Sequence, residues 1–122
     1  MSYLAVVLSE QSSEKLKKVF GNIQPDWEWY GHHMTIKLGG ATTELQRYVG
    51  TQYTLLVTHI GQSDLAVAVK VADSGLSLNK IPHVTLRVNT KQNGKPVDSN
   101  KIVHWNKVES VFSINGIVEE LV

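Results

Sequence analysis

A six-residue pattern that occurs twice constrains the fold of this chain more than any other feature of the sequence. The pattern reads His, apolar, Thr, apolar, basic, apolar, and it spans residues 33–38 and residues 83–88. Successive side chains of an extended strand point to opposite faces, so the His, Thr and basic residue of each copy share one face. The repeat therefore predicts two strands that each bury an apolar face and carry the same polar row on the other.

The two polar rows combine groups that suit phosphate chemistry. They consist of His33, Thr35 and Lys37 in the first copy and of His83, Thr85 and Arg87 in the second. Imidazoles act as base and acid near neutral pH, because their ordinary pKa lies close to it. Threonine hydroxyls can donate to phosphate oxygens on which charge builds, and the two cations can neutralise a phosphate. If the strands lie side by side, both histidines and both threonines are candidate catalytic residues, and Lys37 and Arg87 are candidates for substrate binding.

The alternative interpretation of each copy is a sheet strand with a surface His and Thr that have no function, since Thr favours strands in any case. If the pattern occurred only once, the interpretation without a function would be favoured over a site. The doubled pattern with a matching basic residue favours a site, although short motifs of this kind are hypotheses. For Lys37 and Arg87, a solvated strand face and a ligand contact stay open as alternatives.

Composition limits the fold and the function further. A chain of 122 residues has the size of one domain, and we expect residues 1–122 to form a single one. Hydrophobic residues make up 42% and charged residues 19%, which excludes wholesale disorder. The net charge of +1 excludes an overall field that would bind nucleic acid indiscriminately, so anion recognition must be local. The sequence has no cysteine, which excludes disulfides and thiolate metal sites and fits a reducing compartment.

The apolar run at residues 4–8 is too short for a membrane span and leads directly to Glu10. We therefore expect a mature, soluble, cytoplasmic protein that does not associate with membranes. Its small size and nearly neutral charge indicate a monomer or a weak dimer, and we expect a monomer.

The first part of the chain predicts a strand followed by a helix. Residues 3–8 form an apolar run of strand length. Residues 9–20 change to helical spacing, with Ser9 or Ser12 able to cap the start and Gly21 at the position of a C-terminal glycine cap.

The middle of the chain predicts a break, a short helix and a hairpin. Glycines at residues 39–40 end the first motif strand, and residues 42–49 can form a short helix. Residues 51–60 and 65–71 are rich in β-forming residues and are joined by a turn at residues 61–64. The second of these runs is apolar on both faces and is therefore expected to be a central strand.

The last part of the chain predicts a loop and a second hairpin. Residues 89–100 are polar and are expected to form a mobile loop beside the site. Residues 107–114 and 117–122 read as two strands that fold back through Asn115-Gly116, a strong hairpin signal. Strands dominate with one or two helices, which makes this an α+β sheet protein.

Three aromatic residues precede the first motif, namely Trp27, Trp29 and Tyr30. They can cover the core or form a platform on which a base or ribose stacks. Burial in the core is the commoner fate of such side chains. Tyr30 is retained as a candidate substrate-binding residue because it stands nearest to the motif.

The two motifs, His33-Met34-Thr35-Ile36 and His83-Val84-Thr85-Leu86, resemble those of the two-histidine phosphoesterase superfamily. Within that superfamily the chain looks most like the cyclic phosphodiesterase domain of fungal tRNA ligases and of related RNA-repair-like proteins. The segment at residues 94–100 after the second motif has the character of that branch. The chain is short for the superfamily, and its helix after the first motif is much reduced.

The resemblance implies a fold and an activity. The fold is a pseudo-symmetric, two-lobed antiparallel sheet domain with one or two flanking helices and an active-site groove between the lobes. The activity is metal-independent hydrolysis of a 2′,3′-cyclic phosphate, at an RNA end or on a nucleotide, to a 2′-phosphate. By analogy with the family, His83 is the base and His33 the acid, although nothing in the residues themselves decides between them.

Two other functions stay open at this point. One is hydrolysis of signalling cyclic dinucleotides, as some phage-borne relatives in the superfamily perform it. The other is a binding module that holds an RNA end or a nucleotide without turning it over. Intact histidines in both motifs favour catalysis, because a binder has no need of two proton carriers.

The remaining histidines are expected to lie outside the chemistry. His32 should point away from His33 and serve as a packed or capping residue, and His59 and His104 are expected to be structural or surface residues. Scattered histidines without cysteine or paired acidic ligands do not predict a metal site, and no cofactor is expected.

Overall fold

The computed structural model describes residues 3–39, 43–73 and 75–122 of the chain. The strands are β1 (Tyr3–Leu8), β2 (Glu28–Trp29), β3 (His33–Leu38), β4 (Gln52–Gln62), β5 (Ala66–Ala72), β6 (His83–Val88) and β7 (Trp105–Leu121). The helices are α1 (Glu10–Phe20), α2 (Thr43–Gln46) and the two 3-10 helices η1 (Thr90–Gln92) and η2 (Pro96–Lys101). The expected α+β character is confirmed.

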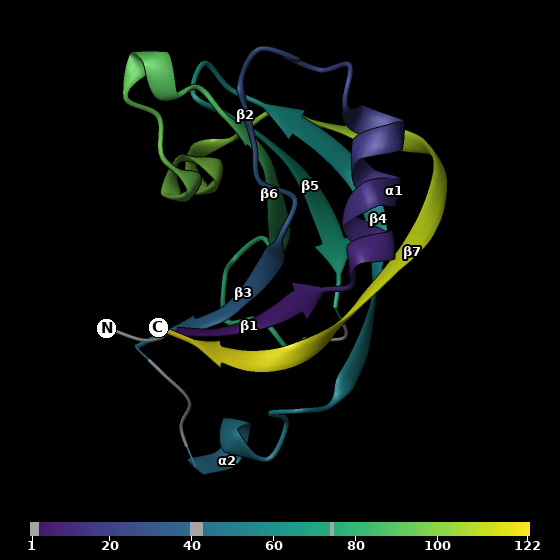
Figure 1. Cartoon of the computed structure of the whole chain (residues 1–122), viewed down its shortest axis with the longest axis vertical. Helices are drawn as coiled ribbons and strands as arrows, with labels where there is room; N and C mark the ends of the chain where they lie inside the picture. Colours follow the sequence, from purple (N-terminus) through teal and green to yellow (C-terminus); the bar gives the residue numbers. More distant parts are fainter. Residues whose placement is uncertain (1–2, 40–42, 74) are drawn as a thin grey trace.

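The strands form one antiparallel sheet that closes on itself. Their order is β2-β6-β3-β1-β7-β4-β5, and β5 also pairs with β6, so that six strands form a closed barrel and β2 adds to the edge of β6 (Figure 1). Backbone pairing in the barrel is least extensive between the two motif strands, β3 and β6. Within the described residues, Met34 and Val84 are the one residue pair that joins them. Both motif strands are therefore neighbours, although fifty residues of chain separate the copies.

The core lies inside this closed sheet and under α1. The apolar faces of both motif strands point into it, and Met34, Ile36, Val84 and Leu86 are completely buried. Leu16 and Phe20 of α1 pack against the same core. The ring of Phe20 stacks on that of Phe112 from β7. The predicted apolar faces of the two motif strands are confirmed except at Leu38, which is 69% exposed and lies at the end of its strand outside the core.

The helix at the start of the chain begins as its sequence predicts. Ser9 is the N-cap of α1, and its side chain accepts a hydrogen bond from the backbone N–H of Ser12 at 3.1 Å. The hydroxyl of Ser12 in turn accepts the backbone N–H of Asn115 in β7. The first turn of α1 is therefore also bound to β7.

The second predicted hairpin is wrong. Residues 105–121 form one continuous strand, β7, which runs along β4 and then β1 (Figure 1). Gly116 lies against β1, where a Cβ atom would stand 2.2 Å from the carbonyl oxygen of Val7. The glycine thus permits a close approach of two backbones rather than a turn, and the partners on both sides of β7 decide its path.

Of the other local predictions, the first hairpin is confirmed, whereas the second helix is shorter than predicted and the predicted loop contains helical turns. The hairpin of β4 and β5 is confirmed, with the N–H of Ser63 donating to the carbonyl of Ala66, and β5 lies between β4 and β6 as a central strand. The short second helix covers only Thr43–Gln46, and the predicted start at Thr42 lies outside the described residues. Residues 89–100 contain η1 and most of η2 instead of an irregular loop.

None of the helices in the described part of the chain has both the length and the apolar character that a membrane span requires.

Candidate active site

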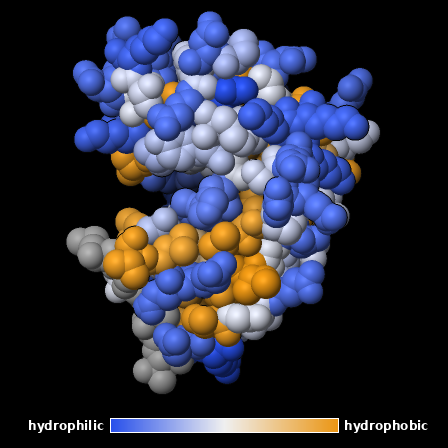
Figure 2. Space-filling model, viewed as in Figure 1, coloured by the Kyte–Doolittle hydropathy of each residue, from blue (hydrophilic) through white to orange (hydrophobic). Residues whose placement is uncertain are grey.

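A pocket of about 340 Å³ opens between the two motif strands and η2. Figure 2 shows the molecule hollowed on that side, below the hydrophilic upper part. Its lining residues come from β1, from β3 and the residues that flank it, from the segment before β6, from β6 and from η2: Tyr3, Tyr30, His33, Thr35, Leu38, Asn79, His83, Thr85, Pro96, Val97 and Asn100. The structure thus brings both histidines, both threonines and Tyr30 of the predicted site together.

The register of the motif strands explains how the four motif residues meet. Met34 pairs with Val84 and both point into the core. In an antiparallel pair the flanking residues lie across from each other on the other face. Extending the register of this one pair puts His33 across from Thr85 and Thr35 across from His83, which accounts for all four side chains lining one pocket.

The imidazole of His83 is held in one orientation by its own backbone. Its Nδ1 lies 2.7 Å from the carbonyl oxygen of Ile81. A carbonyl only accepts, so Nδ1 carries the proton, and Nε2 of the neutral ring is left with a lone pair. Burial lowers the pKa of His83, and the hydrogen bond to Ile81 opposes part of that shift. A neutral ring with an unprotonated Nε2 is the form that can accept a proton.

The imidazole of His33 is surrounded by other rings. The ring of Tyr3 from β1 lies 5.4 Å away between centroids. Burial, followed by the charges of His32 and His83, lowers the pKa of His33 to about 4. Both motif histidines are therefore neutral at neutral pH.

The position of His32 contradicts its prediction. Its Nδ1 lies 2.9 Å from Nδ1 of His33, so the two neighbouring rings meet instead of pointing apart. The alternation of a strand does not apply, because β3 begins at His33 and the preceding Gly31 has a φ of +50°. His59 and His104 do not line the pocket, as predicted.

The two threonines differ in their partners. The hydroxyl of Thr85 lies 2.8 Å from that of Ser99 in η2 and 3.4 Å from the carbonyl oxygen of Pro96. If the Ser99 hydroxyl donates, the Thr85 proton is available for the Pro96 carbonyl or for a phosphate oxygen. Thr35 is half-buried in the pocket wall. η2 therefore orients one threonine of the pair.

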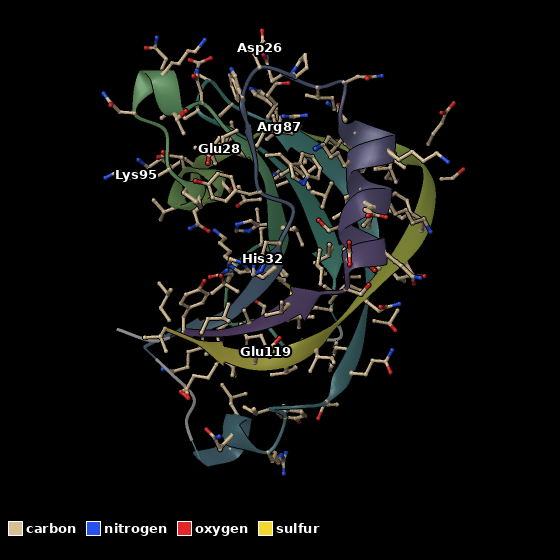
Figure 3. All side chains as sticks on the ribbon, viewed as in Figure 1. Asp26, Glu28, His32, Arg87, Lys95 and Glu119 are labelled. Carbon is tan, nitrogen blue, oxygen red and sulfur yellow. The ribbon has the colours of Figure 1, made fainter. Side chains whose placement is uncertain are left out.

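Arg87 does not lie in the pocket, which contradicts its prediction as a substrate-binding residue. It is buried, and its guanidinium donates to the carbonyls of Trp27 at 2.6 Å, Gly21 at 3.0 Å and Pro25 at 3.3 Å. The same group lies over the ring of Trp29, and Figure 3 shows Arg87 close to the loop after α1 and away from His32. The long side chain starts on the polar face of β6 but turns toward the end of α1, where it ties the helix and the loop to the sheet.

Lys37 lies beyond the pocket lining at the end of β3. Its ammonium donates to the carbonyl of Leu38 at 3.1 Å, and its role in substrate binding stays a prediction. Trp27 and Trp29 pack against the core, whereas Tyr30 lines the pocket. The aromatic cluster therefore divides between the two predicted roles.

Apart from Tyr30, sequence reasoning did not name the pocket residues that lie outside the motifs. Tyr3, Asn79 and Asn100 line the pocket, and Ser99 supports Thr85. Each comes from a segment that only the closed sheet brings to the motifs. The one sequence signal was the polar segment at residues 89–100, which was expected beside the site and contributes Asn100 there.

Charge and metal ligands complete the description of the site. Among the described residues that line the pocket, the imidazoles are the groups that can become positive. Within the described ranges, no three His, Cys, Asp or Glu side chains gather in a way that could hold a metal ion.

No protein-family model matches the chain, and no curated protein is significantly similar to it. The resemblance to the two-histidine phosphoesterases therefore rests on the two motifs and on the character of residues 94–100.

Proposed function

We propose that the protein is a metal-independent phosphodiesterase that hydrolyses 2′,3′-cyclic phosphates of RNA ends or nucleotides to 2′-phosphates. One observation carries the proposal: His33 and His83 line a single pocket together with Thr35 and Thr85. Two imidazoles can supply both proton transfers that the reaction needs, and two hydroxyls can hold the phosphate between them.

In the proposed reaction His83 is the base. Its Nε2 lone pair takes a proton from a water molecule that attacks the phosphorus. The bond from phosphorus to the 3′ oxygen breaks, and His33 gives the proton on its Nε2 to that oxygen while its Nδ1 takes up a proton that comes from solvent, so that the ring ends neutral. The product carries a 2′-phosphate and a free 3′ hydroxyl. The division of roles rests on the hydrogen bond from His83 to the Ile81 carbonyl, which directs the unprotonated nitrogen of this ring away from its backbone.

The remaining lining of the pocket suits the nucleoside part of such a substrate. Tyr3 and Tyr30 offer aromatic faces for a base, and Asn79 and Asn100 offer amides that donate and accept. In this proposal the two motif strands belong to two related lobes of the domain, and the groove between the lobes is the active site. The physiological partner is an RNA that ends in a cyclic phosphate or a cyclic nucleotide, and the site works in a monomer in the cytoplasm.

The test is a turnover assay with a chelator present. The purified chain is incubated with 2′,3′-cyclic mononucleotides, with an RNA that ends in a cyclic phosphate and with a 3′,3′-linked cyclic dinucleotide. The variant that carries both His33→Ala and His83→Ala serves as the control. We expect the first two substrates to yield 2′-phosphates with the wild-type chain only.

Other outcomes would point elsewhere. Turnover of the cyclic dinucleotide alone would replace the substrate but keep the two-histidine mechanism. Binding of these ligands without turnover would make the protein a binding module. Activity that the chelator abolishes would rule out the metal-independent mechanism.

A further inference from the structure

The contact between His32 and His33 lies at the edge of the proposed site, and the proposed reaction does not use it. The Nδ1 atoms of the two rings are 2.9 Å apart, the ring centroids are 5.2 Å apart and the planes meet at 83°. His32 is exposed to solvent and is not part of the pocket lining, whereas His33 is half-buried in it. The pair thus joins the pocket to bulk water.

The backbone holds His32 in this position. Its carbonyl accepts the N–H of Leu8 at 2.9 Å. The preceding Gly31 is buried, donates its N–H to the carbonyl of Thr85 and accepts the hydroxyl of Ser13. A Cβ atom at Gly31 would meet the ring of Trp29 at 2.5 Å, so only glycine fits. Contacts to β1, β6 and α1 therefore fix the bend that turns the two imidazoles toward each other.

A hydrogen bond between two ring nitrogens contains one proton. If one Nδ1 carries it, the other Nδ1 must accept, so the tautomers of the two neutral rings are opposite. When His32 donates, His33 must carry its proton on Nε2. That is the tautomer that an acid in the pocket requires. When His33 donates, its Nε2 has a lone pair and cannot give a proton.

We propose that His32 is a positioning residue that donates its Nδ1 proton to His33, sets the tautomer of His33 and resupplies its proton from solvent. The inference rests on the proposed function, in which His33 is the acid. As Nε2 of His33 gives its proton to the 3′ oxygen, Nδ1 of His33 takes the proton from Nδ1 of a cationic His32. Both rings end neutral, while His83 carries the proton taken from water, so that charge and protons balance.

The surroundings disfavour a positive charge on the ring of His33. The titratable side chains that the described elements place against His33 are Tyr3 from β1, His83 from β6 and His32 itself. Burial and two neighbouring imidazoles lower the pKa of His33 to about 4, whereas His32 is exposed to water. A charge that water solvates costs less than one inside the pocket. The exposed ring can therefore store the proton that the pocket ring transfers.

The test is the variant His32→Asn, whose side chain can still hydrogen-bond but does not titrate. His104→Asn is the matched control, because His104 is exposed and lies outside the pocket. We expect kcat to fall by about 10- to 100-fold with little change in KM, a loss as large as that of metal-bound histidines which lose their hydrogen-bond partner. The alkaline limb of the kcat profile should shift to lower pH, because only the buried His33 remains to supply the proton.

A second measurement does not depend on turnover. Correlation spectra of the ring nitrogens and their protons report which nitrogen of each histidine is protonated. We expect His33 to carry its proton on Nε2 in the wild-type chain and to populate both tautomers in His32→Ala. A wild-type His33 protonated on Nδ1 would overturn the inference and also the assignment of His33 as the acid. A tautomer that ignores the His32 substitution would overturn the inference alone and leave the proposed function intact. Absence of wild-type turnover on every substrate would overturn the proposed function itself.

Discussion

The two copies of the motif carry the same residue types on neighbouring strands but are held in different ways. In the second copy, His83 binds a backbone carbonyl and Thr85 contacts Ser99. In the first copy, His33 contacts a second imidazole that is exposed to solvent. A carbonyl fixes the tautomer of its partner, whereas an imidazole can exchange roles with it. The comparison teaches that a repeated motif can hold one imidazole in a fixed tautomer on one strand and an imidazole with an adjustable tautomer on the other.

The basic residues of the two copies differ even more. Arg87 is buried and donates to three carbonyls, whereas Lys37 lies at the end of β3 and donates to the carbonyl of Leu38. The guanidinium offers several donors in a plane and can satisfy several acceptors at once, which an ammonium on a flexible stem does less well. The matching positions therefore serve structure in one copy and leave ligand binding open in the other.

The largest expected effect separates the two histidines from the rest of the molecule. His33→Ala and His83→Ala should each lower kcat by about 10²- to 10⁴-fold, because each removes one proton transfer. Steady-state assays on a 2′,3′-cyclic mononucleotide measure the loss, with His104→Ala as the control. Equal activity of either variant and the wild-type chain would break the proposed pairing of base and acid.

The second prediction concerns the two basic residues. Arg87→Ala should lower the free energy of unfolding by about 2–4 kcal/mol, because three carbonyls lose a charged donor. Lys37→Ala should change it by less than about 1 kcal/mol. Urea denaturation of both variants provides the measurement. Similar effects of the two substitutions would show that the copies use their basic residues alike.

The third prediction uses the lowered pKa of His33. The unfolded chain protonates this histidine near pH 6.5 and the folded chain only near pH 4. Between these values the unfolded state binds more protons, so the free energy of unfolding should fall as the pH falls from 6.5 to 4. Urea titrations at pH 7.5 and pH 5 should show a smaller loss for His33→Gln than for the wild-type chain. An identical loss in the two chains would mean that His33 titrates normally.

The smallest expected effect tests the support of Thr85. Ser99→Ala removes the hydroxyl beside Thr85 and should lower kcat by about 2- to 10-fold, the equivalent of one neutral hydrogen bond. Ser110→Ala, at an exposed position of β7, should leave kcat unchanged. If Ser99→Ala also leaves kcat unchanged, η2 does not orient the threonine of the second copy.

Local sequence signals predicted most of the elements but not their neighbours. The helical spacing of residues 9–20 and the serine at their start predicted α1, and the alternation in residues 33–38 and 83–88 predicted the two motif strands. The turn signal at Asn115-Gly116 predicted a hairpin that the structure does not contain, because such a signal reports only the conformational preference of a short segment in isolation. Pairing with β1 and β4 stabilises the extended form and overrides that preference.

Local sequence rules also predicted part of the candidate site. The rule that alternate side chains share a face placed His33 with Thr35 and His83 with Thr85. The same rule failed for His32, because Gly31 bends the chain just before the strand, and for Arg87, because a long side chain can leave the face on which it starts.

By itself the sequence determined the two strands, their apolar faces and the residue types available for chemistry, since these follow from local periodicity. Only the tertiary structure decided that the strands are neighbours, that η2 completes the pocket and that His32 meets His33. These features depend on contacts between segments far apart in the chain, which no local pattern encodes. The closed sheet supplies those contacts, because β5 pairs with β6 and so closes the barrel. The single residue pair between β3 and β6 then holds the two motif strands next to each other.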